Sequence, residues 1–361
     1  MTLADRAAGL LRLLEPERAH RVAIRFASRA RFRLPPEAAD PRLKVDVLGL
    51  SFPNPVGLAA GFDKNAAAPD ATLRLGFGFV EVGTVTPLPQ MGNHPPRLFR
   101  LPADRALINR LGFNNDGHEA MAELLDRRAG QGIVGVNIGA NRDSDDRIFD
   151  YVAGVRLFAP MASYITINVS SPNTPGLRQL QARDALTELL ARLTEARLAA
   201  AEESGRRTPL LLKVAPDLTD RWLAEALEAA MRGGVDGLII ANTTIARPPL
   251  KSSRHTQQQG GLSGQPLFDR STAMLARARQ LAGPEAVLVG VGGVDSAAAA
   301  WSKIAAGADL VQLYTALIYD GPSLPRRIAA GLLRRLEERH IPHIGAVRGI
   351  ETERWAAAWE G

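Results

Sequence analysis

The sequence contains no cysteine, which excludes disulfide bonds, a cysteine nucleophile and any zinc or iron–sulfur site held by thiolates. It also has no run that approaches the roughly 18 or more apolar residues of a membrane-spanning helix. We expect no secretory signal either, because charged residues interrupt each apolar stretch near the start: Asp5, Arg6, Arg12 and Glu15. These absences fit a reducing cytoplasm. The hydrophobic content of 46% is sufficient for a large core and excludes a disordered chain.

Positive charge is in excess, but nearly all of the excess lies in one segment. The 361 residues include 44 Lys and Arg and 38 Asp and Glu, a net charge of +6. Residues 1–33 hold eight arginines against three acidic residues, or +5, and the remainder holds 36 basic against 35 acidic residues, or +1. A nucleic-acid-binding protein is expected to line its binding face with such charge. We therefore expect no nucleic-acid partner, and an anionic surface, first of all a membrane, that meets the N-terminal segment.

Residues 1–36 are expected to form two short helices, which Pro35 and Pro36 end. Apolar residues recur at helical spacing before and after Pro16: Leu3, Ala7, Leu10, Leu11 and Leu14, then Ala19, Val22, Ala23, Phe26 and Ala30. The arginines lie largely off these two faces. An arginine-rich amphipathic pair lies on a membrane surface or packs on the main domain, and the sequence leaves both alternatives open. The membrane alternative predicts a peripheral protein on the cytoplasmic face of the inner cell membrane.

From Val56 onward the chain alternates apolar strands with helical patterns, which is typical of a parallel sheet. The expected strands are 56–60, 79–84, 133–138, 164–169, 209–214, 237–242, 287–292 and 309–314. Helical patterns follow them, for example at 182–204, 219–232 and 295–306. Eight such units over about 280 residues predict an α/β fold of the (β/α)8 TIM-barrel type. A doubly wound sheet is the alternative, but no G-x-G-x-x-G follows the first strand.

The barrel is expected to span residues 44–338, with a hairpin at 44–52 leading into it. The 85–116 insertion and the 244–266 loop are too long for simple connections, and we expect them to be lids or walls of a site. Residues 339–361 form a C-terminal tail whose role the sequence does not reveal.

The strand at 164–169 runs into SSPNTPG, where an apolar segment stops at hydroxyl, carboxamide and turn residues. The active site of a TIM barrel lies at such strand ends. Polar residues or glycines follow nearly every expected strand: Gly61, Asp63, Lys64, Asn65, Gly83, Thr84, Thr86, Asn137, Gly139, Asn168, Ser171, Asn173, Lys213, Asn242, Thr243, Gly290 to Gly293, Tyr314 and Thr315. A mere scaffold would not place polar groups in this way, so the pattern predicts an active site.

The chemistry of these strand ends excludes some kinds of site. They show no cluster of carboxylates or histidines, so we expect no metal centre. Gly292 and Gly293 follow the seventh strand, at the usual phosphate corner of this fold, although ordinary turn glycines are an equal alternative. Lys213 ends a buried strand, where a lysine is costly unless it meets an anion. A reduced flavin ring carries such a charge.

Eight segments, in order, resemble dihydroorotate dehydrogenases of the membrane-associated, quinone-using class (class 2). They are AAGFDKN (59–65), EVGTVTPLPQMGNHPPRLFRLP (81–102), INRLGFNNDG (108–117), VNIGAN (136–141), INVSSPNTPGLRQLQ (167–181), ANTT (241–244), GGLSGQPL (260–267) and GVGGVDS (290–296). The resemblance spans about residues 10–335 and fades from His340. It implies FMN-dependent oxidation of (S)-dihydroorotate to orotate, with electrons passed to a membrane quinone, in UMP biosynthesis.

The resemblance also implies which residues bind the ligands. One non-covalent FMN would be held by Ala60, Gly61, Phe62, Asp63, Lys64, Thr84, Asn137, Asn168, Lys213, Ala241, Gly264, Gly293, Tyr314 and Thr315. The substrate would be bound by Lys64, Asn109, Arg110, Leu111, Gly112, Phe113, Asn168, Asn173, Asn242 and Thr243. His20 and Arg100 match positions that line the quinone tunnel, although His20 is equally explained as a capping or surface histidine. Ala241 departs from the family, which often has a hydroxyl residue there, so its flavin contact would come from the backbone.

The position of the catalytic base distinguishes the classes. The resemblance places Ser171 there, whereas class 1 enzymes have a cysteine and one subtype needs an iron–sulfur partner subunit. The absence of cysteine and the N-terminal helix pair both select class 2, without such a partner. One rival interpretation, a tRNA dihydrouridine synthase, predicts a cysteine acid and a basic barrel face. A second, a non-catalytic phosphate-binding barrel that acts as a membrane adaptor, needs neither Ser171 nor Lys213.

Overall fold

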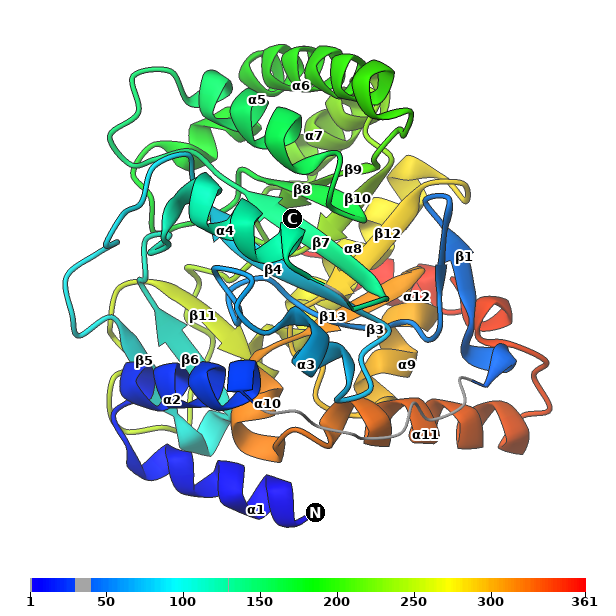
Figure 1. Cartoon of the computed structure of the whole chain (residues 1–361). Coiled ribbons are helices and arrows are strands. Elements are labelled where there is room, and N and C mark those ends of the chain that lie inside the picture. The colour runs from blue at the N-terminus through cyan, green and yellow to red at the C-terminus, as the bar shows by residue number, and fades with distance from the viewer. Residues whose placement is uncertain (1, 30–39, 129) are drawn as a thin grey trace.

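The computed structural model describes residues 2–29, 40–128 and 130–361. Eight parallel strands close into a barrel in the order β10-β12-β13-β3-β4-β7-β8-β9, and helices surround it (Figure 1). The strands are β3 (Val56–Leu58), β4 (Phe79–Val85), β7 (Ile133–Ile138), β8 (Tyr164–Asn168), β9 (Leu210–Val214), β10 (Gly237–Ile240), β12 (Val287–Val291) and β13 (Leu310–Leu313). The predicted TIM barrel is confirmed, and its closure excludes the doubly wound alternative.

Helices follow the strands in the alternation that the sequence predicts. They are α3 (Pro69–Leu73), α4 (Gly117–Asp126), α5 (Arg147–Phe158), α6 (Arg183–Ser204), α7 (Asp220–Arg232), α8 (Phe268–Ala282), α9 (Ala297–Ala305), α10 (Thr315–Asp320) and α11 (Leu324–Glu338). Local capping explains several of their bounds. Thr219 accepts a hydrogen bond from the backbone of Trp222 and begins α7, and Gly205, in the left-handed region at φ 68°, ends α6.

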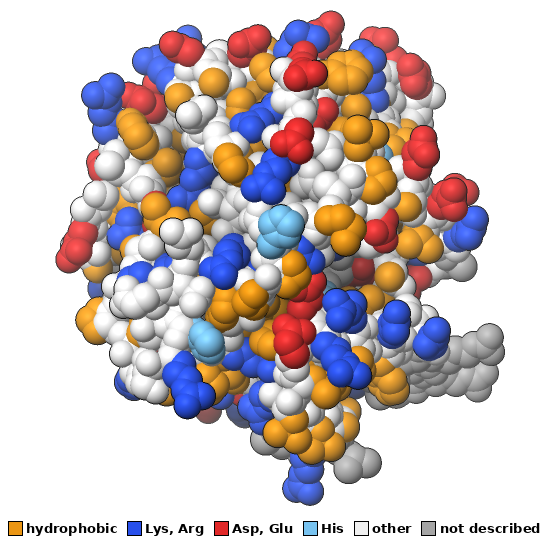
Figure 2. Space-filling model, turned by 90° about the vertical axis from the view of Figure 1, so that its left-hand side faces the viewer, with side chains coloured by type: hydrophobic (Ala, Val, Ile, Leu, Met, Phe, Trp, Pro, Cys, Tyr) orange, Lys and Arg blue, Asp and Glu red, His pale blue; other side chains and the backbone are white. Residues whose placement is uncertain are grey.

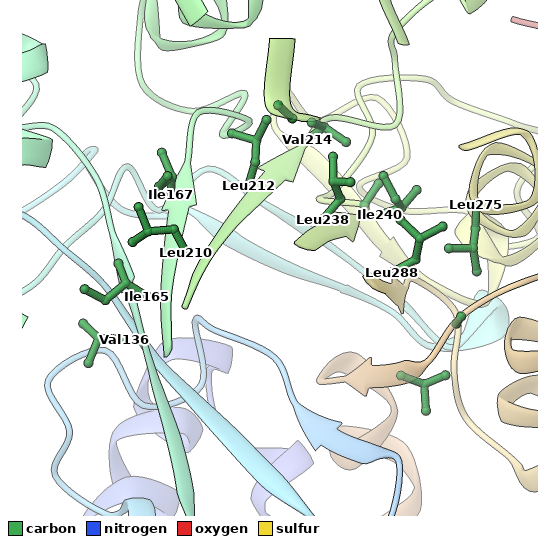
Figure 3. Close-up of a cluster of buried hydrophobic side chains, with 14 of the residues drawn as sticks. Val136, Ile165, Ile167, Leu210, Leu212, Val214, Leu238, Ile240, Leu275 and Leu288 are labelled. Carbon is green, nitrogen blue, oxygen red and sulfur yellow. The ribbon is translucent and has the colours of Figure 1, made fainter. Parts of the chain in front are cut away.

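The outer faces of the strands form the main core with these helices. Parallel strands covered on both faces are apolar on both, and their side chains alternate between the two faces. Figure 3 shows one part of this core, formed by Val136, Ile165, Ile167, Leu210, Leu212, Val214, Leu238, Ile240, Leu275 and Leu288.

The inside of the barrel changes from apolar to polar along the strands. Near the amino ends of the strands, the inside is filled by an apolar cluster: Phe52, Phe79, Tyr164, Leu211, Ile239, Val289 and Leu310. The predicted hairpin, β1 (Val45–Val47) and β2 (Leu50–Phe52), supplies Phe52, whose ring lies 5.2 Å from that of Phe79. Two residues further along four of these strands the inward positions are buried polar residues: Glu81, Thr166, Lys213 and Gln312. The barrel is therefore closed by apolar side chains at one end and offers polar ones at the other.

A three-stranded antiparallel sheet lies beside the carboxyl end of the barrel. It consists of β5 (Leu98–Leu101), β6 (Ala106–Asn109) and β11 (Gly261–Gly264), in the order β11-β6-β5. The two insertions expected to be lids or walls, 85–116 and 244–266, thus meet through strand pairing, with Gly261 opposite Asn109. The sequence did not reveal this pairing because each strand is only four residues long.

The N-terminal segment forms two helices, as predicted. They are α1 (Leu3–Leu10), followed by a 3-10 turn at Leu11–Leu13, and α2 (Pro16–Arg29). The predicted end of the pair, with Ala30, Arg31, Arg33, Pro35 and Pro36, lies outside the described residues. In the described ranges no helix is long and apolar enough to cross a membrane.

This segment both packs on the barrel and exposes apolar surface. Asp5 accepts hydrogen bonds from the backbone N–H (3.0 Å) and hydroxyl (2.7 Å) of Ser323. Glu17 pairs with the guanidinium of Arg97 at 2.5 and 3.0 Å. Apolar side chains nevertheless remain exposed: Leu10 by 66%, Leu13 by 84% and Phe26 by 67%. The structure therefore confirms packing on the main domain, and contact of the exposed apolar side chains with a membrane stays a prediction.

The C-terminal tail packs on the outside of the barrel. Ile344 and Val347 are buried, and α12 (Thr352–Ala356) places the ring of Trp355 5.9 Å from that of Phe268. The carboxylate of Asp309, 3% exposed, accepts from Arg279 of α8 at 3.0 Å and from Arg348 of the tail at 2.6 Å.

These two arginines make a matched pair for a stability test. Arg279 is buried and also donates to the backbone carbonyls of Gly283, Pro284, Ala286 and Gly307, whereas Arg348 is 37% exposed. We expect Arg279→Met to lower the free energy of unfolding by about 3–5 kcal/mol, and Arg348→Met by about 1 kcal/mol or less. Urea unfolding followed by circular dichroism measures both. Equal losses in the two variants would contradict this assignment.

Candidate active site

A cavity opens at the carboxyl ends of the barrel strands, under the β5-β6-β11 sheet. It has a volume of about 1270 Å³, part of which is open solvent at its mouth. Most residues that the sequence analysis selected line it: Ala60, Gly61, Lys64, Thr84, Asn109, Leu111, Gly112, Phe113, Asn168, Ser171, Asn173, Lys213, Ala241, Asn242, Thr243, Gly264, Gly293, Tyr314 and Thr315. Among the described residues no group of three His, Asp or Glu side chains could hold a metal ion.

Six selected residues do not line the cavity, and their contacts explain why. Phe62 lies behind Tyr314, with ring centroids 5.8 Å apart. Asp63 accepts from the backbone N–H groups of Ala67 (2.9 Å) and Ala68 (2.7 Å) and so shapes the loop that carries Lys64. The other four are Asn137, Arg110, His20 and Arg100.

Arg110 and Arg100 support loops rather than the cavity surface. Arg110 donates to Gln258 (2.8 Å) and to the carbonyl of Pro96 (2.9 Å), and its guanidinium lies 4.7 Å from the centroid of the Phe99 ring. Arg100 donates to the carbonyls of Arg12 (3.0 Å) and Leu14 (2.7 Å), at the turn between α1 and α2.

A buried carboxylate, which the sequence analysis missed, lies beneath the cavity floor and bonds to Gln312, which lines the cavity. Glu81 is fully buried and accepts hydrogen bonds from Asn137 Nδ2 (2.8 Å), Tyr164 OH (3.1 Å), Thr166 Oγ1 (3.1 Å) and Gln312 Nε2 (2.8 Å). These donors compensate the cost of burying a charge. A lone acid within the apolar run FVEVGTV (79–85) was the only signal in the sequence.

Lys213 brings a positive charge to the same floor. Burial lowers the pKa of Lys213, and the negative charge of Glu81 opposes that shift. Lys213 lines the cavity, and within the described part of the chain its ammonium forms no hydrogen bond. Gln312 Oε1 is buried and also lacks a partner there. The floor therefore offers a cation and an unused acceptor to a ligand.

Hydrogen bonds fix the orientation of the carboxamides above this floor. Asn168 Nδ2 donates to Thr84 Oγ1 (2.9 Å) and Asn137 Oδ1 (3.2 Å), and its Oδ1 accepts from Ser170 Oγ (2.9 Å). Asn242 Nδ2 donates to the same Ser170 Oγ at 2.9 Å. Asn137 Oδ1 also accepts from Thr84 Oγ1 at 2.5 Å. The fully buried Asn137 thus orients Thr84 and Asn168, which line the cavity, instead of lining it itself.

Ser171 lies on the wall formed by the loop after β8. It is 5% exposed, and its Oγ accepts from the backbone N–H of Asn173 at 3.3 Å. Asn173 Nδ2 donates to Asn109 Oδ1 at 3.2 Å, and Asn93 Nδ2 donates to the Asn173 carbonyl at 3.2 Å. No histidine or carboxylate bonds to the Ser171 hydroxyl in the ranges that the structure describes. A proton taken up by this serine must therefore leave through other hydroxyls or water.

The N-terminal helices reach the cavity wall through His20. Its ring lies 5.7 Å from that of Phe62, and its Nδ1 lies 3.4 Å from the hydroxyl of Tyr314, which lines the cavity. Burial, and then the positive charge of Lys64, lower the pKa of His20 to about 3, so the ring is neutral at pH 7. His20 is therefore packed between helix and barrel, which contradicts the capping or surface alternative. Burial also lowers the pKa of Lys64, to about 8.

Three glycines form a corner of the cavity in which no side chain would fit. Gly264, Gly292 and Gly293 all have φ in the left-handed region, at 99°, 104° and 70°. A Cβ on Gly293 would lie 2.5 Å from Phe268 Cβ, and one on Gly292 would lie 2.7 Å from Ser271 Oγ. The backbone here is thus exposed to a ligand without an intervening side chain. Gly292 and Gly293 follow β12, the seventh barrel strand, after which TIM barrels often bind phosphate.

The Glu81 network predicts a stability effect. We expect Glu81→Gln to lower the free energy of unfolding by about 1–3 kcal/mol, because the new NH2 group would face donors that then lose their acceptor. Glu225→Gln is the control, since Glu225 pairs with the 82% exposed Arg221 on α7 and should change stability by about 0.5 kcal/mol or less. Urea unfolding of both variants measures this. A loss for Glu81→Gln no greater than for the control would contradict the central role of the network.

Comparisons with known proteins agree with this site. The family model described as dihydroorotate dehydrogenase matches residues 42–336. The chain is 58% identical to a dihydroorotate dehydrogenase (quinone) of Brucella anthropi over 318 residues, which cover 88% of this chain and 87% of that protein. It is 57% identical to the enzyme of the same name from Brucella ovis over 319 residues, 88% of each chain.

Solved structures show the same likeness. The chain matches the crystal structure of DHODH from Eimeria tenella in complex with ferulenol with a TM-score of 0.88 and 39% identity, over 93% of this chain and 95% of that one. The ligand-free form from the same organism matches with a TM-score of 0.87 and 40% identity, over 93% and 99%. The family expected from the sequence is confirmed: the chain belongs to the dihydroorotate dehydrogenases, and within them to the quinone-dependent class 2.

Proposed function

We propose that the chain oxidises (S)-dihydroorotate to orotate on one non-covalently bound FMN and passes the electrons to a membrane quinone, as a step of UMP biosynthesis. The observation that carries the proposal is the cavity floor. Lys213 and the unused acceptor of Gln312 suit a flat ring that has N–H groups and becomes anionic on reduction. The family is flavin-dependent; that the flavin is FMN, and a single one, is our inference from the glycine corner.

The residues of the cavity fit the parts of this cofactor. The phosphate would be held at Gly264, Gly292 and Gly293, beside Tyr314 and Thr315. The ring would be held by Ala60, Gly61, Thr84, Asn168 and Lys213. When bound, the flavin supplies a hydride acceptor for the substrate and an electron donor for the quinone. Lys213 stabilises the negative charge that develops there, and preorganised charge of this kind is commonly worth a few kcal/mol.

The substrate would lie between the flavin and the β5-β6-β11 sheet. Asn109, Asn168, Asn173 and Asn242 present donors and acceptors for a flat ring rich in amides. Their orientations are fixed before substrate arrives, by the bonds to Thr84, Ser170 and neighbouring carbonyls. Lys64 would bind the carboxylate of the substrate. Leu111, Gly112 and Phe113 form the apolar side of the same space.

Ser171 is the proposed base. It takes the proton from the carbon next to the ring carbonyl of dihydroorotate, while the neighbouring carbon gives up its hydride. We expect Ser171→Ala to bind substrate nearly as the parent does but to slow flavin reduction by about 10²–10⁴-fold, the usual contribution of a positioned proton acceptor. Anaerobic stopped-flow absorption measures this rate.

Two further variants test the assignment of Ser171. Ser171→Cys should recover part of the rate at moderately alkaline pH, where a thiolate is available. Ser170→Ala, one residue away, removes a hydroxyl that orients Asn168 and Asn242, and should weaken substrate binding more than it slows reduction. An alanine variant at position 171 that reduces flavin at the parental rate would assign the role to another group.

The N-terminal helices are the proposed membrane-docking element and quinone entrance. Figure 2 shows hydrophobic side chains and lysine or arginine side chains gathered at the bottom of the molecule, where Figure 1 places α1 and α2. Leu10 and Leu13 are among the exposed apolar residues there. His20 and Arg100, at the inner side of this element, are the proposed quinone contacts. We place the protein on the cytoplasmic face of the inner membrane, with an anionic lipid surface as partner and no iron–sulfur subunit.

A charge-neutralising variant tests this docking. Changing Arg21, Arg25 and Arg29 to glutamine keeps the apolar faces and should weaken binding to anionic vesicles and turnover with a long-chain quinone. Turnover with a soluble acceptor dye should remain, and parental vesicle binding should fall as salt rises. The matched control changes three exposed arginines on α6 and α7, at the opposite end in Figure 1, to glutamine: Arg192, Arg221 and Arg232. If both triple variants bind vesicles like the parent, the N-terminal arginines do not dock the protein.

The rival functions have less support. A tRNA dihydrouridine synthase would need a cysteine acid, which the chain lacks, and the family match favours dihydroorotate dehydrogenase instead. A non-catalytic adaptor does not explain Lys213 in the cavity floor with Glu81 beneath it, because phosphate binding at the glycine corner needs neither.

A further inference from the structure

A buried lysine lies behind the glycine corner and has no part in the mechanism above. Lys303 of α9 is fully buried. Its Nζ donates to Ser271 Oγ at 2.6 Å and lies 5.4 Å from the centroid of the Phe268 ring. The negative charge of Asp269 opposes the lowering of the Lys303 pKa. None of the described carboxylates, however, forms an ion pair with the lysine. The amine thus has one hydrogen-bond acceptor and no neutralising partner.

Ser271 connects this lysine to the cavity. Its Oγ lies 3.2 Å from the carbonyl oxygen of Gly292 and 3.1 Å from that of Phe268. The two glycines fit against the same residues, because a Cβ on Gly292 would meet Ser271 and one on Gly293 would meet Phe268. Both glycines line the cavity. Lys303, Ser271 and the glycine corner are therefore one packed unit, with the amine on the side away from the ligand.

Burying the charged amine of Lys303 costs free energy unless an anion occupies the glycine corner. Burial lowers the pKa of Lys303 well below its usual value, since the charged form is poorly solvated there. An anion in the adjoining corner offsets that cost, because charges separated by protein rather than water are weakly screened. A residue that served only to fill this space could be apolar, as most of its buried neighbours on α9 are: Ala299, Ala300, Trp301, Ile304 and Ala305.

We propose that Lys303 is a positioning residue for the phosphate group of the flavin. It holds Ser271, and through Ser271 the backbone at Gly292, and its positive charge behind the corner favours a phosphorylated flavin over the same ring without phosphate. The inference rests on the proposed FMN function and deepens it by naming what selects the phosphate. Lys213 serves the ring and Lys303 the phosphate, so loss of Lys303 leaves the reduction of bound flavin unchanged.

The test is flavin exchange in the holoprotein of Lys303→Met, whose side chain has a similar length and no charge. Holoprotein is equilibrated with mixtures of FMN and riboflavin, and the bound flavins are separated and quantified. We expect the preference for FMN over riboflavin to fall about tenfold or more, as for loss of a partner to a charged group. Riboflavin binding should change by about threefold at most, and FMN that remains bound should be reduced by dihydroorotate at the parental rate.

Trp301→Phe is the control. Trp301 is on the same helix, but its ring faces Arg335 and Arg339 of α11 at 5.8 and 5.2 Å, so the flavin preference should stay parental. An equal loss of affinity for FMN and riboflavin in Lys303→Met would give the lysine a packing role only and overturn the proposal. Should that variant not fold, Ser271→Ala carries the test: a reduced FMN preference supports the proposal and a parental one overturns it. A parent protein that binds no flavin would instead overturn the proposed cofactor.

Discussion

The attraction between two buried charges, Glu81 on β4 and Lys213 on β9, is the interaction on which the cavity depends. Burial lowers the pKa of Lys213, and the negative charge of Glu81 opposes that shift. The Glu81 carboxylate itself accepts hydrogen bonds from four donors on β7, β8 and β13. Glu81 therefore joins strands from around the barrel and places a negative charge near Lys213, directly above the apolar cluster inside the barrel.

In the proposed function, this arrangement would separate the tasks of the quinone-dependent oxidation of dihydroorotate. The barrel floor and the carboxamide wall, fixed by hydrogen bonds, would act on the ring chemistry. The glycine corner, with Lys303 behind it, would bind the phosphate. The N-terminal helices touch the cavity only at its edge, through His20 on Phe62 and Tyr314. Because burial keeps His20 neutral, the imidazole itself adds no charge at this edge.

The fold and most of the cavity lining were predictable from the sequence, because apolar periodicity marks strands and polar strand ends mark the site. Ser171, Lys213 and Asn168 lie in the cavity as expected. Glu81 and Lys303 were missed for a common reason: each is a single charged residue within an apolar element, and its role comes from partners far away in the chain, such as Gln312 and Ser271. The pairing of β6 with β11 was missed likewise, since register between distant short strands leaves no local pattern.

We propose that this cavity holds a flavin and that dihydroorotate transfers electrons to it. The most direct measurement is the visible absorption spectrum of the purified protein before and after anaerobic addition of dihydroorotate. We expect a flavin spectrum that corresponds to about one FMN per chain, bleached on addition with formation of one orotate per flavin, and restored by quinone. A colourless protein, or a flavin band that dihydroorotate leaves unchanged, would contradict it.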